Sequence, residues 1–240
     1  VIHFSWHYVF VITSLASFLT LIGLWRYTPN KPSPSNFNFS GLVRKYFLIL
    51  KNHSFWLGTL AAAFICMPIC FWISQAPNLI LYKLHQTYHH YIVYQLISLF
   101  GIIISSIFVQ IFAGRCSMAF LIKKGAWLML ISLSMALLGY KYILVIVISL
   151  FFYTLGFGLV YGCIIRLVMS IKEFEKNLIA TIFGFLQSCL LSIGIICVNK
   201  ICHYYDYTLL SFTFSLFITG VFSFWMIKKF VAFHHLREWE

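Results

Sequence analysis

Acidic residues are nearly absent from this sequence, which has five Asp and Glu against 17 Lys and Arg in 240 residues. Charged residues make up only 9% of the chain, whereas soluble domains carry about 25%. So few charges cannot cover the surface of a soluble domain of this length. Hydrophobic residues make up 62% of the chain and aromatic residues 20%. The composition therefore indicates an all-α membrane protein that crosses the bilayer several times.

The few acidic residues lie in the wrong places for an enzyme. Glu173, Glu175, Asp206, Glu238 and Glu240 all fall outside the long apolar runs. No such run contains Asp, Glu or His, so acid–base, metal-assisted and His-assisted nucleophilic catalysis lack their groups. We therefore expect no enzymatic activity and no cofactor.

Disulfide and metal frameworks are also absent. The seven cysteines lie mostly inside apolar runs and show no spacing typical of disulfide pairs. Cys66 and Cys70 are four residues apart on one helical face, but no His or carboxylate accompanies them. We interpret them as buried packing residues and predict no metal site.

Seven apolar runs are long enough, or nearly so, to cross a bilayer as helices. The fourth is short and could begin earlier, at Ala119 to Ile122. The predicted spans are Tyr8–Trp25, Phe55–Leu79, Tyr91–Ala113, Gly125–Tyr140, Tyr142–Met169, Leu178–Val198 and Leu209–Ile227. The count alone also permits a receptor or photoreceptor, but the last run has no lysine that could hold retinal. A receptor-like protein is therefore the less favoured alternative.

A polar stretch from Arg26 to Ser54 separates the first span from the other six. Pro29, Pro32 and Pro34 mark it as a linker, because proline removes a backbone donor and disfavours helix in the preceding residue. The sequence thus divides into 1–26, a linker at 27–54 and a six-helix bundle at 55–240. Within the linker, residues 39–50 place Leu42, Tyr46, Ile49 and Leu50 opposite Arg44, Lys45 and Lys51. This spacing predicts an amphipathic helix on the membrane surface, the alternative being an early start of the second span.

Basic residues gather in alternate connectors, 14 in one set and 3 in the other. This distribution places the linker and the C-terminus in the cytoplasm, and it excludes the continuous patch that nucleic acid requires. The first residue is then outside. No signal-peptide pattern precedes it and the chain begins with Val1, so we expect an odd number of further spans before it.

Several short motifs, in the right order, resemble the major facilitator superfamily. Ser5–Phe10 and Arg26–Asn30 resemble the start and end of its sixth helix, although Asn30 replaces the usual acidic residue. Ile73–Ile80 and the span through Gly114 and Arg115 resemble its seventh and eighth helices. Gly156–Gly158 resembles the tenth helix, and Ala180–Gln187 the eleventh. The nearest likeness is to drug:proton antiporters of the bicyclomycin/chloramphenicol-resistance type.

The resemblance implies a C-terminal portion of a twelve-helix transporter. Residues 1–26 would be the last helix of the N-terminal bundle, and 55–240 the whole C-terminal bundle. Helices one to five, the missing N-terminal half, would be the partner. The expected function is part of a secondary active transporter exporting small lipophilic or drug-like compounds across the bacterial inner membrane. Proton coupling would depend on the missing half, because no carboxylate lies in a span. A truncated, inactive remnant is the alternative.

Polar and aromatic residues within the spans are the candidates for contact with a small-molecule substrate. The candidates are Phe71, Trp72, Gln75, Asn78, Tyr153, Thr154 and Gln187. Helix–helix hydrogen bonding is the alternative for Gln187, and the amides beside Pro77 could instead satisfy backbone that the proline leaves unpaired. Hinge or close-packing positions are expected at Pro68, Pro77, Gly156, Gly158 and Gly184.

Overall fold

A computed structural model describes residues 7–27, 39–112, 116–171, 174–204 and 208–233. The chain divides into two units, Val1–Phe39 and Ser40–Glu240, which are described separately. The described residues form helices and no strands, which confirms the all-α class. In the first unit, α1 spans His7–Tyr27 and includes the short apolar helix Val11–Tyr27.

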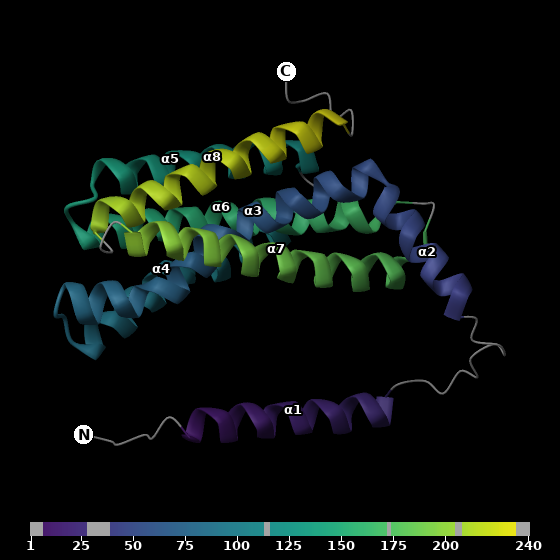
Figure 1. Cartoon of the computed structure of the whole chain (residues 1–240), viewed down its shortest axis with the longest axis horizontal. Coiled ribbons are helices and arrows are strands. Elements are labelled where there is room, and N and C mark those ends of the chain that lie inside the picture. The colour runs from purple at the N-terminus through teal and green to yellow at the C-terminus, as the bar shows by residue number, and fades with distance from the viewer. Residues whose placement is uncertain (1–6, 28–38, 113–115, 172–173, 205–207, 234–240) are drawn as a thin grey trace. The chain divides into compact units, whose positions relative to one another are not determined.

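The second unit is a bundle of long helices with their axes roughly aligned (Figure 1). Six of its helical segments are long and apolar enough to cross a membrane, so this chain is a multi-pass membrane protein. The helices are α2 (Phe39–Lys51), α3 (His53–Pro77) continued by the π-helix η1 (Asn78–Lys83), α4 (Tyr88–Phe112), α5 (Met118–Leu138), α6 (Ile143–Met169), α7 (Lys176–Tyr204) and α8 (Leu209–Phe233). Each predicted span coincides with one of these helices or, for the first, with α1.

The fourth span begins before Gly125, in agreement with the earlier start at Ala119 to Ile122 that the sequence left open. Ser117 begins α5 as its N-cap, with extended backbone and a side-chain oxygen that accepts a hydrogen bond from Phe120 N at 3.2 Å. Lys123 and Lys124 therefore lie inside the helix rather than in a connector. The Lys124 ammonium is 5.7 Å from the centre of the Phe120 ring, a contact that accommodates a cation near a helix end. Other helices also exceed the prediction, and His53, His89 and His203 fall in their end turns.

The amphipathic helix is separate from the second span. Asn52 is the N-cap of α3, and its side chain accepts a hydrogen bond from Phe55 N at 3.0 Å. The Trp56 indole donates to Leu50 O at 2.6 Å and fixes the corner between the two helices. Ile49 is fully buried, so one face of α2 packs on the bundle. The early-start alternative is thereby excluded, while the position of α2 on a membrane surface stays a prediction.

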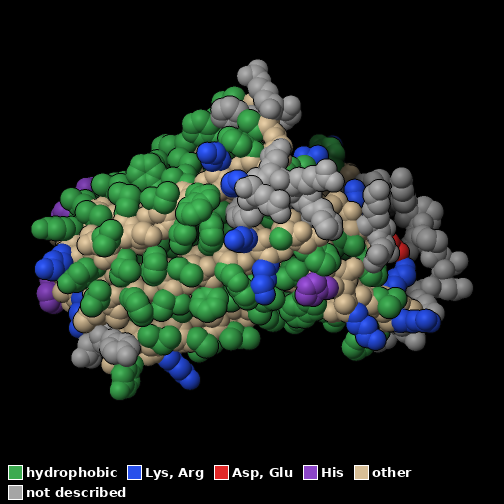
Figure 2. Space-filling model, turned by 90° about the horizontal axis from the view of Figure 1, so that it is seen from above, with side chains coloured by type: hydrophobic (Ala, Val, Ile, Leu, Met, Phe, Trp, Pro, Cys, Tyr) green, Lys and Arg blue, Asp and Glu red, His purple; other side chains and the backbone are tan. Residues whose placement is uncertain are grey.

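Helix α3 is the most buried helix of the bundle and α7 the least. In the most apolar stretch of α3 with η1, 72% of the residues are buried, whereas in that of α7 only 11% are buried. Helix α6 packs closely on α4 and α5, and α3 packs on α6, α7 and α8. Hydrophobic side chains spread over the visible surface (Figure 2), as expected for a protein that contacts lipid. Helices α7 and α4 therefore leave most of their apolar surface uncovered by the bundle itself.

Candidate functional site

Gln187 joins three helices near the middle of the bundle. Its side chain is only 7% exposed. Its Nε2 donates to the hydroxyl of Tyr161 on α6 at 2.9 Å and lies 3.3 Å from Cys66 Sγ on α3. The Tyr161 hydroxyl lies 3.1 Å from Gln187 Oε1 and can donate to it. A buried amide in a membrane helix needs such partners, so the helix–helix hydrogen bonding proposed as the alternative is present.

Open space borders this cluster on both α6 and α7. A β-carbon built at Gly162, next to Tyr161, would meet no other atom within 4 Å, and the same holds at Gly184, one turn before Gln187. The Tyr161 ring is partly exposed and stacks on Phe157 with centroids 4.9 Å apart. The residue after Tyr161 and the residue one turn before Gln187 thus each face open space. Whether Gln187 contacts a substrate there stays a prediction.

The sequence singled out Gln187 but not Tyr161 or Cys66. Tyr161 lies four residues after Phe157 and so on the same helical face, which was the available signal. Cys66 and Cys70 were both interpreted as buried packing residues; Cys66 is buried, with 8% of its side chain exposed, whereas Cys70 is only partly buried. No group of three His, Cys, Asp or Glu side chains that could hold a metal occurs in the described part of the chain.

Tyr153 and Thr154 lie in the core of the bundle. Tyr153 is fully buried, and its hydroxyl donates to Ile65 O of α3 at 2.8 Å. The Thr154 hydroxyl lies 2.7 Å from Ser98 O of α4 and 2.9 Å from Phe151 O of its own helix. Both side chains therefore connect α6 to a neighbouring helix. Their predicted role in a cavity wall is not tested by these contacts.

Phe71 and Trp72 are likewise buried, with exposures of 2% and 1%. The Trp72 indole donates to the Ser98 hydroxyl of α4 at 2.8 Å. The Phe71 ring stacks on Phe212 of α8 with centroids 5.1 Å apart. The two aromatic side chains thus hold α3 against α4 and α8, and substrate contact stays a prediction for them too.

The amides beside Pro77 form a chain between α3 and α7. Gln75 Nε2 donates to Asn199 Oδ1 at 2.5 Å, and Asn78 Nδ2 donates to Gln75 Oε1 at 3.3 Å. The π-helix η1 begins at Asn78, directly after Pro77. These contacts are between side chains rather than with the backbone that the proline leaves unpaired. Asn199 was missed because it lies beyond the predicted end of its span, whereas α7 continues to Tyr204.

Backbone that a proline leaves unpaired is satisfied at Pro68. Proline has no N–H, so Phe64 O, four residues earlier, has no helical donor. The Ser223 hydroxyl of α8 lies 2.6 Å from Phe64 O and 2.8 Å from Thr219 O of its own helix. A hydroxyl from the last helix therefore occupies the gap in α3. The sequence indicated the gap but not the distant residue that fills it.

Two of the three candidate glycines are close-packing positions. A β-carbon at Gly156 would lie 2.8 Å from Gly125 O of α5, and one at Gly158 would collide with Ser105 of α4. These contacts bring α6 close to both neighbours. Gly184 differs, because a β-carbon there meets open space. Close packing within this unit does not account for Gly184, whose role as a hinge stays a prediction.

Comparisons with known proteins agree with this architecture. A family model described as Major Facilitator Superfamily matches residues 1–199. The protein named Multidrug transporter MdfA from Edwardsiella ictaluri is 28% identical over 199 residues, which are 80% of this chain and 48% of that protein. Its namesakes from Yersinia pestis and Escherichia coli O6:H1 are 26% identical over 197 residues, 79% of this chain and 48% of theirs. The chain spans about half the length of the curated relatives it matches.

Proposed function

The chain belongs to the Major Facilitator Superfamily, and from this premise we propose that Ser40–Glu240 acts as one bundle of a secondary active transporter. The proposed activity is export of small lipophilic, drug-like compounds. The relatives named as multidrug transporters support this substrate class. Membership of a transporter family, together with the absence of acidic residues from α1–α8, also supports a role other than catalysis.

The observation that carries the proposal is the Gln187–Tyr161–Cys66 cluster beside an accessible face. An apolar and aromatic surface with few polar groups suits bulky lipophilic compounds, and a small number of polar groups orients them. The Tyr161 ring and the Gln187 amide provide these two kinds of contact next to open space at Gly162 and Gly184. We assign this face of α6 and α7 to the substrate cavity.

Transport by this mechanism needs a second bundle. In such folds the substrate site lies near the bilayer midplane between two halves, which rock against each other. The proposed cavity therefore has its opposite wall in another bundle, to which α1 would belong. Proton coupling would also depend on that bundle, because a titrating carboxylate within the membrane is the usual coupling group and α1–α8 contain none.

The proposed orientation has α2 and the end of α8 in the cytoplasm of a bacterial cell. Lys83, Lys141 and Lys200 all lie toward the opposite end of the bundle, given the order of its helices. The excess of basic residues is at the end with α2, which is the cytoplasmic end by the positive-inside rule. The bacterial relatives support the inner membrane as the location.

Export can be measured in a bacterial strain that lacks its own major efflux pumps. The chain would be expressed alone and together with the N-terminal half of the Edwardsiella ictaluri relative, with ethidium and chloramphenicol as probes. We expect no efflux from the chain alone and measurable efflux from the pair. Efflux from the chain alone would contradict the need for a second bundle. Absence of efflux from a pair that assembles in the membrane would contradict the proposed export.

A further inference from the structure

A cavity of about 730 Å³ lies between α7 and α8, away from the Gln187 cluster. Val198 and Ile201 line it from α7, and residues between Thr208 and Thr219 line it from the other side. Its volume falls in the range of about 300–1,000 Å³ that is typical of ligand sites. Both helices are long and apolar enough to span a membrane, so the hydrocarbon of the bilayer can reach a groove between them.

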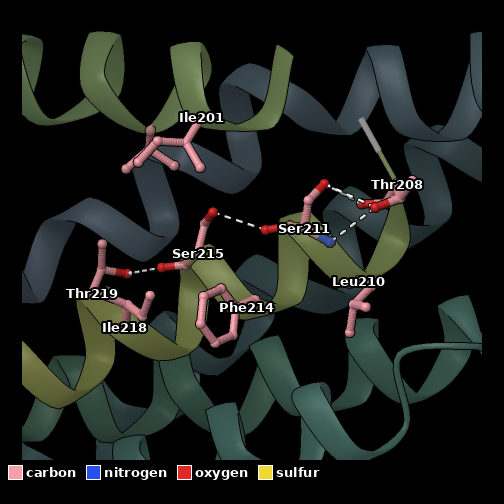
Figure 3. A pocket seen from close by; sticks show the side chains of 9 residues that line it. Ile201, Thr208, Leu210, Ser211, Phe214, Ser215, Ile218 and Thr219 are labelled. Carbon is pink, nitrogen blue, oxygen red and sulfur yellow. Dashed lines mark hydrogen bonds between the residues drawn. The ribbon is translucent and has the colours of Figure 1, made fainter. Parts of the chain in front are cut away.

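The cavity is an open groove, the α7/α8 groove, and its most exposed wall residues are apolar. Leu210, Phe214 and Ile218 are 48%, 51% and 38% exposed, and Ile201 is 49% exposed. Figure 3 shows Ile201 pointing across toward α8, whose Ser215 and Thr219 side chains lie nearby. Such a surface favours hydrocarbon over water.

The hydroxyl groups in the groove do not demand a polar occupant. The Ser215 hydroxyl donates to Ser211 O at 2.8 Å, and the Thr219 hydroxyl lies 2.8 Å from Leu216 O. The Ser211 hydroxyl donates to Thr208 O at 2.9 Å. Because these protons are used within α8, hydrocarbon can fill the groove without leaving a buried donor unpaired.

One end of the groove is suited to a charged headgroup. Thr208 and Ser211 lie where α8 begins, at the same end of the bundle as the C-terminal turn of α7. Lys200, which precedes Ile201, is exposed there and forms no ion pair with any residue that the structure describes. A lysine at a helix end can place its ammonium at the membrane interface, where phosphate groups lie.

We propose that the α7/α8 groove binds one acyl chain of a phospholipid whose phosphate lies near Lys200. An apolar cavity opening onto the bilayer and a cation at its interfacial end together fit an amphipathic lipid. This site is separate from the proposed substrate face of α6 and α7. It therefore does not depend on the transport proposal.

Photocrosslinking of the purified full chain in phosphatidylcholine vesicles tests the proposal. The probe is a small fraction of phosphatidylglycerol with a diazirine in one acyl chain, and crosslinks are mapped by mass spectrometry. We expect labelling of residues 210–218 to exceed that around Ile131, an equally exposed position on α5, by about tenfold. Even labelling around the bundle would overturn the proposal.

Groove-filling variants provide the second measurement. Ile201→Trp and, from the other wall, Ser215→Phe are expected to reduce labelling of residues 210–218 by about tenfold. Ile131→Trp is the matched control and should leave it unchanged. Lys200→Ala should weaken the labelling, whereas Lys141→Ala, at the same end of the bundle, should not. Equal effects of variant and control would overturn the assignment.

Discussion

Several polar side chains connect neighbouring helices of this bundle, and Gln187 is the one that we assign to the proposed substrate face. Gln187→Ala removes the amide that joins α7 to Tyr161 and Cys66. The variant is tested together with a second bundle. If the amide also contacts substrate, the ratio of ethidium export to chloramphenicol export will change, while the amount of the protein in the membrane will change little. Drug accumulation and immunoblotting measure the two quantities.

An exposed serine on another helix provides the control for Gln187. Ser106→Ala on α4 removes a hydroxyl that donates to Ile102 O of its own helix and lies outside the proposed cavity face, so it should change neither quantity. Parallel loss of protein and of export for every compound in Gln187→Ala would assign the residue to packing alone.

Ser223 and Pro68 form a pair whose coupling can be measured. Ser223→Ala leaves Phe64 O without its partner from α8 and should destabilise the protein by about 1–2 kcal/mol. Pro68→Ala restores the helical N–H, so Ser223→Ala on that background should cost about 0.5 kcal/mol or less. Unfolding of the four proteins in detergent gives the coupling. Equal costs on both backgrounds would show that the hydroxyl does not compensate for the proline.

At the scale of whole helices, the glycines of α6 and α7 should respond in opposite ways to added volume. Gly158→Ala brings a methyl group into Ser105 and should destabilise by about 1–3 kcal/mol. Gly184→Ala meets open space and should be neutral or stabilise α7 by up to about 1 kcal/mol. Thermal unfolding of the bundle measures both.

The same glycine separates stability from transport. If Gly184 faces the proposed cavity, Gly184→Ala will reduce export from the two-bundle protein without lowering stability. Normal export by a larger Gly184→Leu variant would remove this position from the cavity wall.

The helices themselves were readable from the sequence, because an apolar run of about 20 residues has one stable form in a bilayer. Their ends were less readable. The start of α5 was left open between Gly125 and Ala119 to Ile122 because Lys123 and Lys124 suggested a connector, whereas the Ser117 cap determines where the helix begins. Helix α2 was predicted because its apolar and basic faces alternate with helical period.

Partners across helices were not readable, since an apolar run does not determine which way each helix is rotated. Gln187 could be singled out as a costly polar group, but Tyr161 could be named as its partner only from the structure. The same holds for Asn199 beside Gln75 and for Ser223 beside Pro68. The predicted cavity residues Phe71, Trp72 and Tyr153 are deeply buried. In a helix that is apolar on all sides, the sequence does not show which side chains face the interior of the bundle.

For the whole molecule, the distribution of basic residues predicts its orientation in the membrane. In a cysteine-free background, Lys45→Cys on α2 should react with an impermeant maleimide only after cells are opened. Lys141→Cys, between α5 and α6, should react in intact cells. The reverse labelling pattern would invert the proposed topology, and labelling of both positions in intact cells would indicate two orientations.

The hydroxyl beside Pro68 also bears on how this protein is made. Phe64 and Ser223 are 159 residues apart, so α3 is synthesised long before its partner residue in α8 exists. At bacterial translation rates this interval is roughly 10–30 s. During that time α3 resides in the translocation machinery or the bilayer with an unpaired carbonyl at its centre. We therefore expect chains that stop before α8 to be degraded by membrane proteases faster than the full chain, because Phe64 O then lacks its partner.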